Sequence, residues 1–440
     1  MDIIFSFMDE ALFAAICLFG FFFAFLITGV PISVGIAVSS ILTALFFLPA
    51  DTAYFVATQK MFAGMDSFTL LAIPFFILSG NLMNKGGIAI RLVNLSKLIS
   101  GKLPGSLAHT NVIANMLFGS ISGSGIAAAA AVGGTMAPLQ KKEGYDPAFS
   151  AAVNIASAPC GILIPPSGPL ILFSLVSGGT SVSALFIGGY GPGILMGVSI
   201  MVVAFIIASR KNYPIAPTPD CKQALHIVLD AMPSLLMVVV VIGGIVAGVF
   251  TATEGAAVAA LYSFLLSLVY RMATWRNYLE VLRTTAVMSA SILFLIAASG
   301  IMSYVMAITS IPDVIAEYLM QFDSPVLIFM IMNVCLLLVG TFMDLTPAVL
   351  IFTPIFLPIA KDLGMDPVHF GLMMIFNLGI GNMTPPVGAV LFVGCSVGEV
   401  TIEQVFKPLL PFFLVLIAAL MMVTYIPAIS TGLPRMLGLI

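Results

Sequence analysis

Two octapeptides, 220 residues apart, decide the fold of this chain: Gly161-Ile162-Leu163-Ile164-Pro165-Pro166-Ser167-Gly168 and Gly381-Asn382-Met383-Thr384-Pro385-Pro386-Val387-Gly388. Adjacent prolines remove two backbone N–H donors and collide with the preceding turn, so a helix that reaches either pair breaks there. The break frees carbonyl oxygens, which suit a cation such as sodium, and the half-helix N-termini beyond it suit an anion. We therefore expect a binding site at the two breaks. The alternative is that each proline pair only kinks its helix.

The same offset relates other short motifs without a gap. The matching pairs are Ser79-Gly80 with Ser299-Gly300, Pro138 with Pro358, Gly144 with Gly364, Asp146-Pro147 with Asp366-Pro367, and Gly168 with Gly388. A constant register over some ninety residues predicts a duplicated chain, with a first copy over 1–220 and a second over 221–440.

The composition indicates that most of this chain lies in a lipid bilayer. Of 440 residues, 60% are hydrophobic and 8% are charged, whereas a soluble domain carries about 25% charged residues. Several long stretches contain no Asp, Glu, Lys or Arg: 11–50, 103–140, 147–209, 284–312 and 408–434. Each is long enough for a membrane span of about 20 residues. Sixteen Lys and Arg leave no basic patch for nucleic acid.

Each copy is predicted to contain five spans and one re-entrant hairpin. The first copy has spans near 11–28, 32–50, 66–83, 148–177 and 185–208, with a hairpin near 107–140. The second has spans near 233–250, 255–270, 285–305, 367–397 and 408–428, with a hairpin near 325–360. The spans 148–177 and 367–397 are the broken helices. The centre of the first hairpin, 119–125, is too small and polar to face lipid.

An odd number of spans per copy requires the second copy to enter the membrane from the opposite side, which makes the repeat inverted. Charge gives a separate criterion, because Lys and Arg concentrate on the cytoplasmic side. Thirteen of the sixteen then lie inside: Lys85, Arg91, Lys97, Lys102, Lys141, Lys142, Arg210, Lys211, Lys222, Arg271, Arg276, Arg283 and Lys407. Lys60, Lys361 and Arg435 lie outside. Both termini are then periplasmic, and the two hairpins open to opposite sides.

Asp344 stands in the second hairpin among apolar residues, and its equivalent in the first hairpin is Ser124. A carboxylate at that depth costs about 2.5–3.5 kcal/mol, so it needs a partner or a function. We expect it near the substrate or the cation, and it can also cap the second hairpin helix. Glu254, in the predicted turn 251–255, is expected to be a solvated helix cap.

The sequence contains no motif that is typical of a catalytic site or a metal cluster. The five Cys form no CxxC pair, and His109, His226 and His369 are scattered along the chain. The sequence offers no convergent set of the kind an enzyme site needs. We therefore expect no catalytic residues, no organic cofactor and no metal other than sodium.

Together these motifs resemble the large membrane subunit of the tripartite ATP-independent periplasmic (TRAP) transporters over nearly the whole chain. The most specific matches are Gly144-Tyr145-Asp146-Pro147 with Ile164-Pro165-Pro166, Asp366-Pro367-Val368-His369-Phe370-Gly371 with Asn377 and the 384–388 break, and Ala252-Thr253-Glu254. The resemblance implies an all-α polytopic protein of the bacterial inner membrane, in the ion-transporter superfamily. It also implies an elevator mechanism, in which hairpins and broken helices form a transport domain that slides against a scaffold.

The resemblance further implies sodium-coupled uptake of a small organic acid: a C4-dicarboxylate, sialic acid or another sugar acid. The implied partners are a separate, small four-span membrane subunit and a periplasmic substrate-binding protein. One implied sodium site uses Gly340, Gly381, Thr384 and Val387, and its repeat-equivalent uses Ser120, Gly161, Ile164 and Ser167. The implied substrate site comprises Ser122, Ser124, Ser167 and Asp344.

Two rival interpretations stay open at this point. The first is a stand-alone sodium/dicarboxylate symporter that needs no binding protein. The second is an intramembrane enzyme or a channel subunit.

Overall fold

The computed structural model describes residues 10–85, 87–215, 220–270 and 274–440, and every regular element in these ranges is a helix. Arg271, one of the arginines predicted to face the cytoplasm, lies outside the described residues.

The first half contains α2 (Glu10–Ile27), α3 (Ile32–Phe47), α4 (Ala50–Met65), the 3-10 helix η1 (Phe68–Leu71), α5 (Ala72–Lys85), α6 (Ile88–Ser100), α7 (Ser106–Ser122), α8 (Gly125–Lys142), α9 (Pro147–Ser157), α10 (Cys160–Leu163), α11 (Gly168–Val176) and α12 (Val182–Arg210). The second half contains α13 (Cys221–Val246), α14 (Ala252–Val269), α15 (Trp275–Ile308), α16 (Ile311–Met320), α17 (Pro325–Phe342), α18 (Leu345–Asp362), α19 (Pro367–Gly381), α20 (Ala389–Gly398), α21 (Ile402–Tyr425) and α22 (Ala428–Met436).

Helix boundaries recur at the sequence offset of 220 residues. The pairs α3 and α14, α8 and α18, α9 and α19, and α12 and α21 each begin 220 residues apart. The N-caps recur as well: the Asp146 carboxylate accepts from the amides of Ala148 and Phe149, and the Asp366 carboxylate accepts from the amide of Val368. The halves differ where the continuous α15 stands opposite α4, η1 and α5, and where the continuous α19 stands opposite α9 and α10.

Among the described helices, nine are long and apolar enough to cross a membrane, or ten if the bent pair Pro147–Leu163 and Gly168–Val176 is one span. This confirms the prediction of an all-α polytopic membrane protein. The predicted breaks are also present, because α10 ends at Leu163 and α19 ends at Gly381, before the two proline pairs. The bend at the first break is 48°.

Several helices lie where the sequence predicted loops. Helix α4 covers the connection between the predicted spans 32–50 and 66–83, and α15 begins in the connection between the predicted spans 255–270 and 285–305. Helices α6 and α16 occupy two other connections between predicted segments. These loop predictions were wrong because a search for long apolar runs passes over helices with charged residues, such as Asp51 and Lys60 in α4. The predicted cap at Glu254 is confirmed, since Thr251 and Glu254 form a reciprocal capping box at the start of α14.

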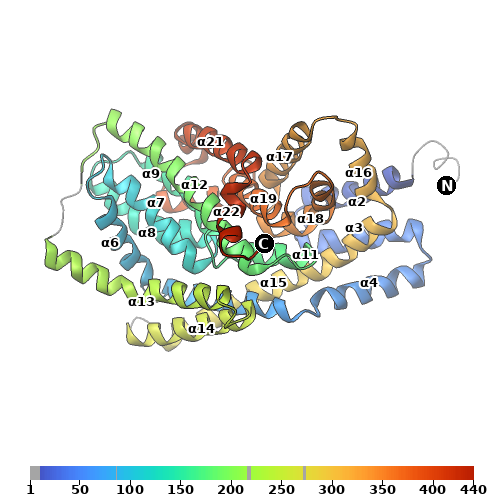
Figure 1. Ribbon diagram of the computed structural model, residues 1–440, viewed down its shortest axis with the longest axis horizontal. Coiled ribbons are helices and arrows are strands. Elements are labelled where there is room, and N and C mark those ends of the chain that lie inside the picture. Colours follow the sequence, from blue (N-terminus) through green and yellow to red (C-terminus); the bar gives the residue numbers. More distant parts are fainter. Residues whose placement is uncertain (1–9, 86, 216–219, 271–273) are drawn as a thin grey trace.

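The helices other than α6 and α16 pack as two groups, and α6 and α16 contact both of them. One group contains α2–α5 and α13–α15, in which α5 packs along α14 and α15 contacts α3, α4 and α5. The other contains α7–α12 and α17–α22, and it includes both hairpins and both broken helices. Helices α4, α13, α14 and α15 run along the lower side of Figure 1, and most of the second group lies above them. We call these the base and the hairpin group.

Buried amide side chains tie each hairpin to its broken helix. In the first half, the Asn115 side-chain nitrogen donates to Asn111 (2.9 Å), Asn154 (3.1 Å) and Ser157 (2.7 Å). In the second half, the Asn377 nitrogen donates to the Asn333 side-chain oxygen (2.8 Å). Hydrogen bonds between buried side chains of two helices hold those helices in one arrangement. These contacts join α7 to α9 and α17 to α19, and so position the hairpin tips relative to the two breaks.

Candidate functional site

A cavity of about 560 Å³ lies where the two hairpin tips meet the base. Its walls from the hairpin group are the tips of both hairpins and residues at the two breaks, 121–127, 344–347, Ile162, Pro166, Gly168, Pro169, Leu172 and Asn382. Its walls from the base are Pro31, Ile32 and Ser33 before and in α3, residues of α5 including Gly80 and Asn81, and residues of α15 including Met288, Ser291 and Leu295. Its volume is typical of a pocket for a small molecule, for which 300–1,000 Å³ is usual.

Helix N-termini line the cavity on the hairpin side. The first turns of α8, α11 and α18 contribute Gly125, Gly168 and Leu345, respectively. Each helix N-terminus carries a partial positive charge and free N–H groups, which suit a carboxylate. No Lys or Arg is present among the described residues that line this cavity. An anion bound here is therefore held by backbone dipoles, hydroxyl and amide groups and any bound cation.

Asp344 lines the cavity at the second hairpin tip, and its side chain is exposed there. The Asn382 side-chain nitrogen donates to the Asp344 carboxylate over 3.3 Å. Asp344 occupies the N-cap position of α18, but its carboxylate accepts no capping hydrogen bond. The cavity and the hydrogen bond from Asn382 lower the cost of holding a carboxylate at this depth. Its position makes the carboxylate available to a cation or a substrate.

Of the four residues predicted to bind substrate, the structure brings three together. Ser122, Ser124 and Asp344 all line the cavity. The Ser124 hydroxyl accepts from the amide of Ala127 (3.3 Å) and so caps α8. Ser167 lies outside the lining, because it is buried and its hydroxyl donates to the carbonyl of Ile162.

The four residues predicted for one sodium site are neighbours at the second break. Gly340 and Gly381 lie in backbone contact, since a Cβ atom added to Gly381 would lie 2.6 Å from the Gly340 Cα. The Thr384 amide donates to the Gly381 carbonyl (2.9 Å), and the Val387 amide donates to the carbonyl of Thr341, next to Gly340 (3.0 Å). The Thr384 hydroxyl donates to the Ile380 carbonyl (2.8 Å). Carbonyl and hydroxyl oxygens therefore gather where the helix breaks.

The predicted equivalent site at the first break is similar but shifted by one residue. The close backbone contact of Gly161 is with Gly119, since a Cβ atom on Gly161 would lie 2.3 Å from the Gly119 Cα. Ser120 is the next residue, and its hydroxyl donates to the Leu117 carbonyl (2.8 Å). The Ile164 amide donates to the Cys160 carbonyl (3.1 Å) and ends α10. The sequence offset alone aligned Ser120 with Gly340 and did not reveal this shift.

Sequence reasoning missed several polar residues of the cavity. Asn382 lies in the second octapeptide, two residues before Thr384, so the sequence did offer a signal for it. Ser33, Asn81 and Ser291 come from three base helices. Nothing in the sequence marks these three, because their place in the cavity depends on how the base packs against the hairpin group. Among the described residues, no group of three or more His, Cys, Asp and Glu side chains forms a metal site.

Comparisons with known proteins agree with this architecture. The family model of the "Tripartite ATP-independent periplasmic transporter, DctM component" matches residues 19–429. The uncharacterised protein YgiK of Salmonella typhimurium is 53% identical over 97% of this chain and 98% of its own length. The large permease protein of a C4-dicarboxylate TRAP transporter of Pseudomonas aeruginosa is 39% identical, over 92% of this chain and 94% of its own.

The large permease protein of a sialic acid TRAP transporter of Vibrio cholerae is 35% identical over 93% of this chain and 96% of its own. A solved structure, the YdaH transporter of Alcanivorax borkumensis, superimposes with a TM-score of 0.62 over 86% of this chain and 89% of its own. At 13% identity, that likeness concerns the fold alone.

Proposed function

The chain belongs to the DctM component family of TRAP transporters, and from this premise we propose that it takes up a small organic acid together with sodium. It is a multi-pass protein of the bacterial inner membrane. Members of the family work with a small membrane subunit and a periplasmic binding protein. Two of its relatives are named as large permease proteins of TRAP transporters, which supports transport rather than catalysis as its role.

The observation that carries the proposal is the cavity between the hairpin tips and the base. Helix N-termini at Gly125, Gly168 and Leu345 offer partial positive charge to a carboxylate. Ser122, Ser124 and Asn382 add groups that hydrogen-bond with a polar substrate. The proposed substrate class is a C4-dicarboxylate, sialic acid or another sugar acid, and two relatives are named for the first two.

A bound sodium ion would offset the charge repulsion between the Asp344 carboxylate and an anionic substrate. The carboxylate and the substrate repel each other at short range. A sodium ion held by carbonyls at the breaks, beside Gly340 and Gly381 or beside Ser120 and Gly161, reduces that repulsion. Substrate and cation then stabilise each other in the site, which couples their movements.

The positions of Lys60 and Arg276 relative to α15 support the proposed inversion of the two copies. Helix α15 has 34 residues and is therefore about 51 Å long, longer than the hydrocarbon core of about 30 Å. Arg276 lies in its first turn, and the Lys60 ammonium lies 5.0 Å from the ring of Tyr304 near its other end. The two residues thus lie near opposite ends of one helix, as copies of opposite orientation require.

The two packing groups support an elevator mechanism. The base would serve as the scaffold, and the hairpin group would carry substrate and sodium across the membrane. The cavity lies at the boundary between the groups, where a sliding domain would expose it to one side and then the other.

Reconstitution of the purified chain in liposomes tests the function. With a small membrane subunit and a binding protein from the same genome, a sodium gradient should drive uptake of the acid that the binding protein carries. Without the binding protein, uptake should fall to background. Sodium-driven uptake of the free acid by this chain alone would contradict the tripartite proposal and favour the stand-alone symporter.

The hydroxyl of Thr384 provides a specific test of the proposed sodium site. Thr384→Val removes the oxygen while retaining the side-chain shape, and we expect the sodium concentration for half-maximal uptake to rise about tenfold. Loss of one ligand oxygen worth about 1.4 kcal/mol gives that factor. Thr58→Val is the matched control, because the Thr58 hydroxyl also donates to the carbonyl four residues earlier, but on α4. An unchanged sodium dependence in Thr384→Val would rule out the hydroxyl as a ligand.

A further inference from the structure

We call the 560 Å³ cavity between the hairpin tips and the base the transport cavity. A second cavity, of about 400 Å³, lies at the opposite end of α8. Gly125 lines the transport cavity and Lys141 lines the second one. Both residues belong to α8, sixteen positions apart. That separation corresponds to about 24 Å along the helix axis. The second cavity is enclosed by the end of α8, the first turns of α9, the end of α20 and Asn111 of α7. It is therefore separate from the proposed substrate site.

Two residues that line this cavity, Asn111 and Ser150, carry a buried polar atom that has no hydrogen-bond partner within the described protein. Asn111 is fully buried. Its side-chain oxygen accepts a hydrogen bond from the Asn115 side-chain nitrogen, so the Asn111 side-chain nitrogen points away from Asn115. The Asn111 nitrogen has no hydrogen-bond partner, and the hydroxyl of Ser150, with 6% of its residue surface exposed, has none. Buried donors without partners are uncommon and call for a ligand or water.

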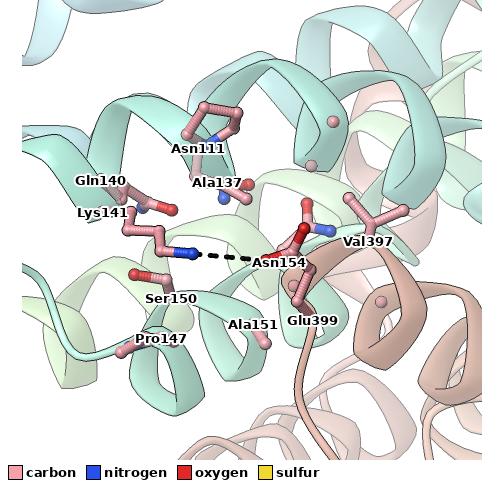
Figure 2. Close-up of a pocket in the computed structure, with 15 residues that line it drawn as sticks. Asn111, Ala137, Gln140, Lys141, Pro147, Ser150, Ala151, Asn154, Val397 and Glu399 are labelled. Atoms are coloured by element: carbon pink, nitrogen blue, oxygen red, sulfur yellow. Dashed lines mark hydrogen bonds and ion pairs between the residues drawn. The ribbon is translucent and has the colours of Figure 1, made fainter.

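The mouth of the cavity carries one ion pair. Figure 2 shows Lys141 reaching from α8 towards Glu399, with Ser150 on α9 nearby. The Lys141 ammonium lies 3.3 Å from the Glu399 carboxylate, and both side chains are largely exposed, at 71% and 79%. Exposed ion pairs of this kind contribute little stability. Glu399 can therefore turn to solvent while Lys141 binds another anion.

We propose that this cavity binds a compact oxyanion, a carboxylate or phosphate group, between Asn111, Ser150 and Lys141. Three donors of this kind fit the acceptor oxygens of such a group. The Glu399 carboxylate weakens binding of the anion, because it repels the anion and competes with it for the Lys141 ammonium. The Lys-rich end of the hairpin group, with Lys141 and Lys142, faces the cytoplasm in the proposed topology. The oxyanion comes from that side, either free in solution or on a lipid headgroup.

Inorganic phosphate is the probe for the free form. The melting temperature of the purified full-length chain in detergent is measured against phosphate concentration, with chloride keeping the ionic strength constant. We expect saturable stabilisation of the wild type. Lys141→Gln should weaken the apparent phosphate affinity about tenfold, and Ser150→Ala should weaken it several-fold. Glu399→Gln should strengthen it, because it removes the competing carboxylate. These opposite signs at one ion pair distinguish a binding site from general salt effects.

Lys142→Gln is the matched control, since Lys142 is adjacent in sequence and does not line this cavity. It should bind phosphate as the wild type does. Micelles of short-chain phosphatidylglycerol, with phosphatidylcholine as the neutral reference, test the headgroup source. Stabilisation by the anionic micelles alone, with the same dependence on Lys141, Ser150 and Glu399, would identify a lipid headgroup as the source. No saturable stabilisation by either probe, or equal stabilisation of all variants, would overturn the proposal and leave a cavity that holds only water.

Discussion

Asp344→Ala is expected to lower sodium-driven uptake about a hundredfold while the protein stays folded in the membrane. The Asp344 carboxylate faces the transport cavity, and the described residues that line this cavity with it include no Lys or Arg. Loss of a charge-assisted contact to sodium is worth about 3 kcal/mol, which corresponds to roughly that factor. Uptake is measured in proteoliposomes that contain all three components, with the melting temperature measured in parallel.

Two further variants make the result specific to the carboxylate. Asp344→Asn keeps the shape of the side chain and the possibility of a hydrogen bond with Asn382, and it should be nearly as inactive as alanine. Asp362→Ala removes an exposed carboxylate at the other end of α18. That control should transport normally. Wild-type uptake by Asp344→Asn would show that the charge at this position has no role.

Gly381→Ala is expected to lower both the melting temperature and uptake, and to raise the sodium concentration for half-maximal uptake at least tenfold. The added Cβ atom would lie 2.6 Å from the Gly340 Cα and 3.0 Å from its carbonyl oxygen. These are backbone atoms, so α17 and α19 have to separate. Overpacking of this kind costs about 1–3 kcal/mol. The separation would also displace the carbonyl oxygens proposed to bind sodium.

Gly379→Ala provides the control on the same helix. A Cβ atom there would have the Pro159 Cβ, at 3.4 Å, as its nearest neighbour. This contact needs only a small adjustment, and alanine favours the helix over glycine by up to about 1 kcal/mol. Stability and sodium dependence should stay close to the wild type. If Gly379→Ala and Gly381→Ala behaved alike, the tight contact between Gly340 and Gly381 would not explain the sodium site.

The proline pairs allowed much of the hairpin group to be predicted from the sequence. A proline pair breaks a helix whatever surrounds it, and the helices do end at Leu163 and Gly381. The small, polar tip at 119–125 and the isolated Asp344 likewise marked the hairpin tips, and Ser122, Ser124 and Asp344 line one cavity. These features are local, so the residue types themselves carry the information.

The base was less predictable, because its contribution depends on packing over long distances in the chain. Asn81 lies in the cavity and its side chain donates to Thr285 of α15 over 3.0 Å, a contact across 204 residues. The one-residue shift at the first break also depends on packing, in this case between α7 and α10 of the hairpin group. Gly119, rather than Ser120, meets Gly161, because a glycine at that point allows the two backbones to touch.

The central claim is that the chain holds two copies of one unit in opposite orientations, whose broken helices and hairpins form one transport site. The most direct test is cysteine accessibility at positions 60 and 276, in an active variant whose five native cysteines are replaced by alanine. With the outer membrane permeabilised, a membrane-impermeant maleimide should label Lys60→Cys at once. It should label Arg276→Cys only after the inner membrane is disrupted. Labelling of both variants from the same side would contradict the inverted arrangement and the transport mechanism built on it.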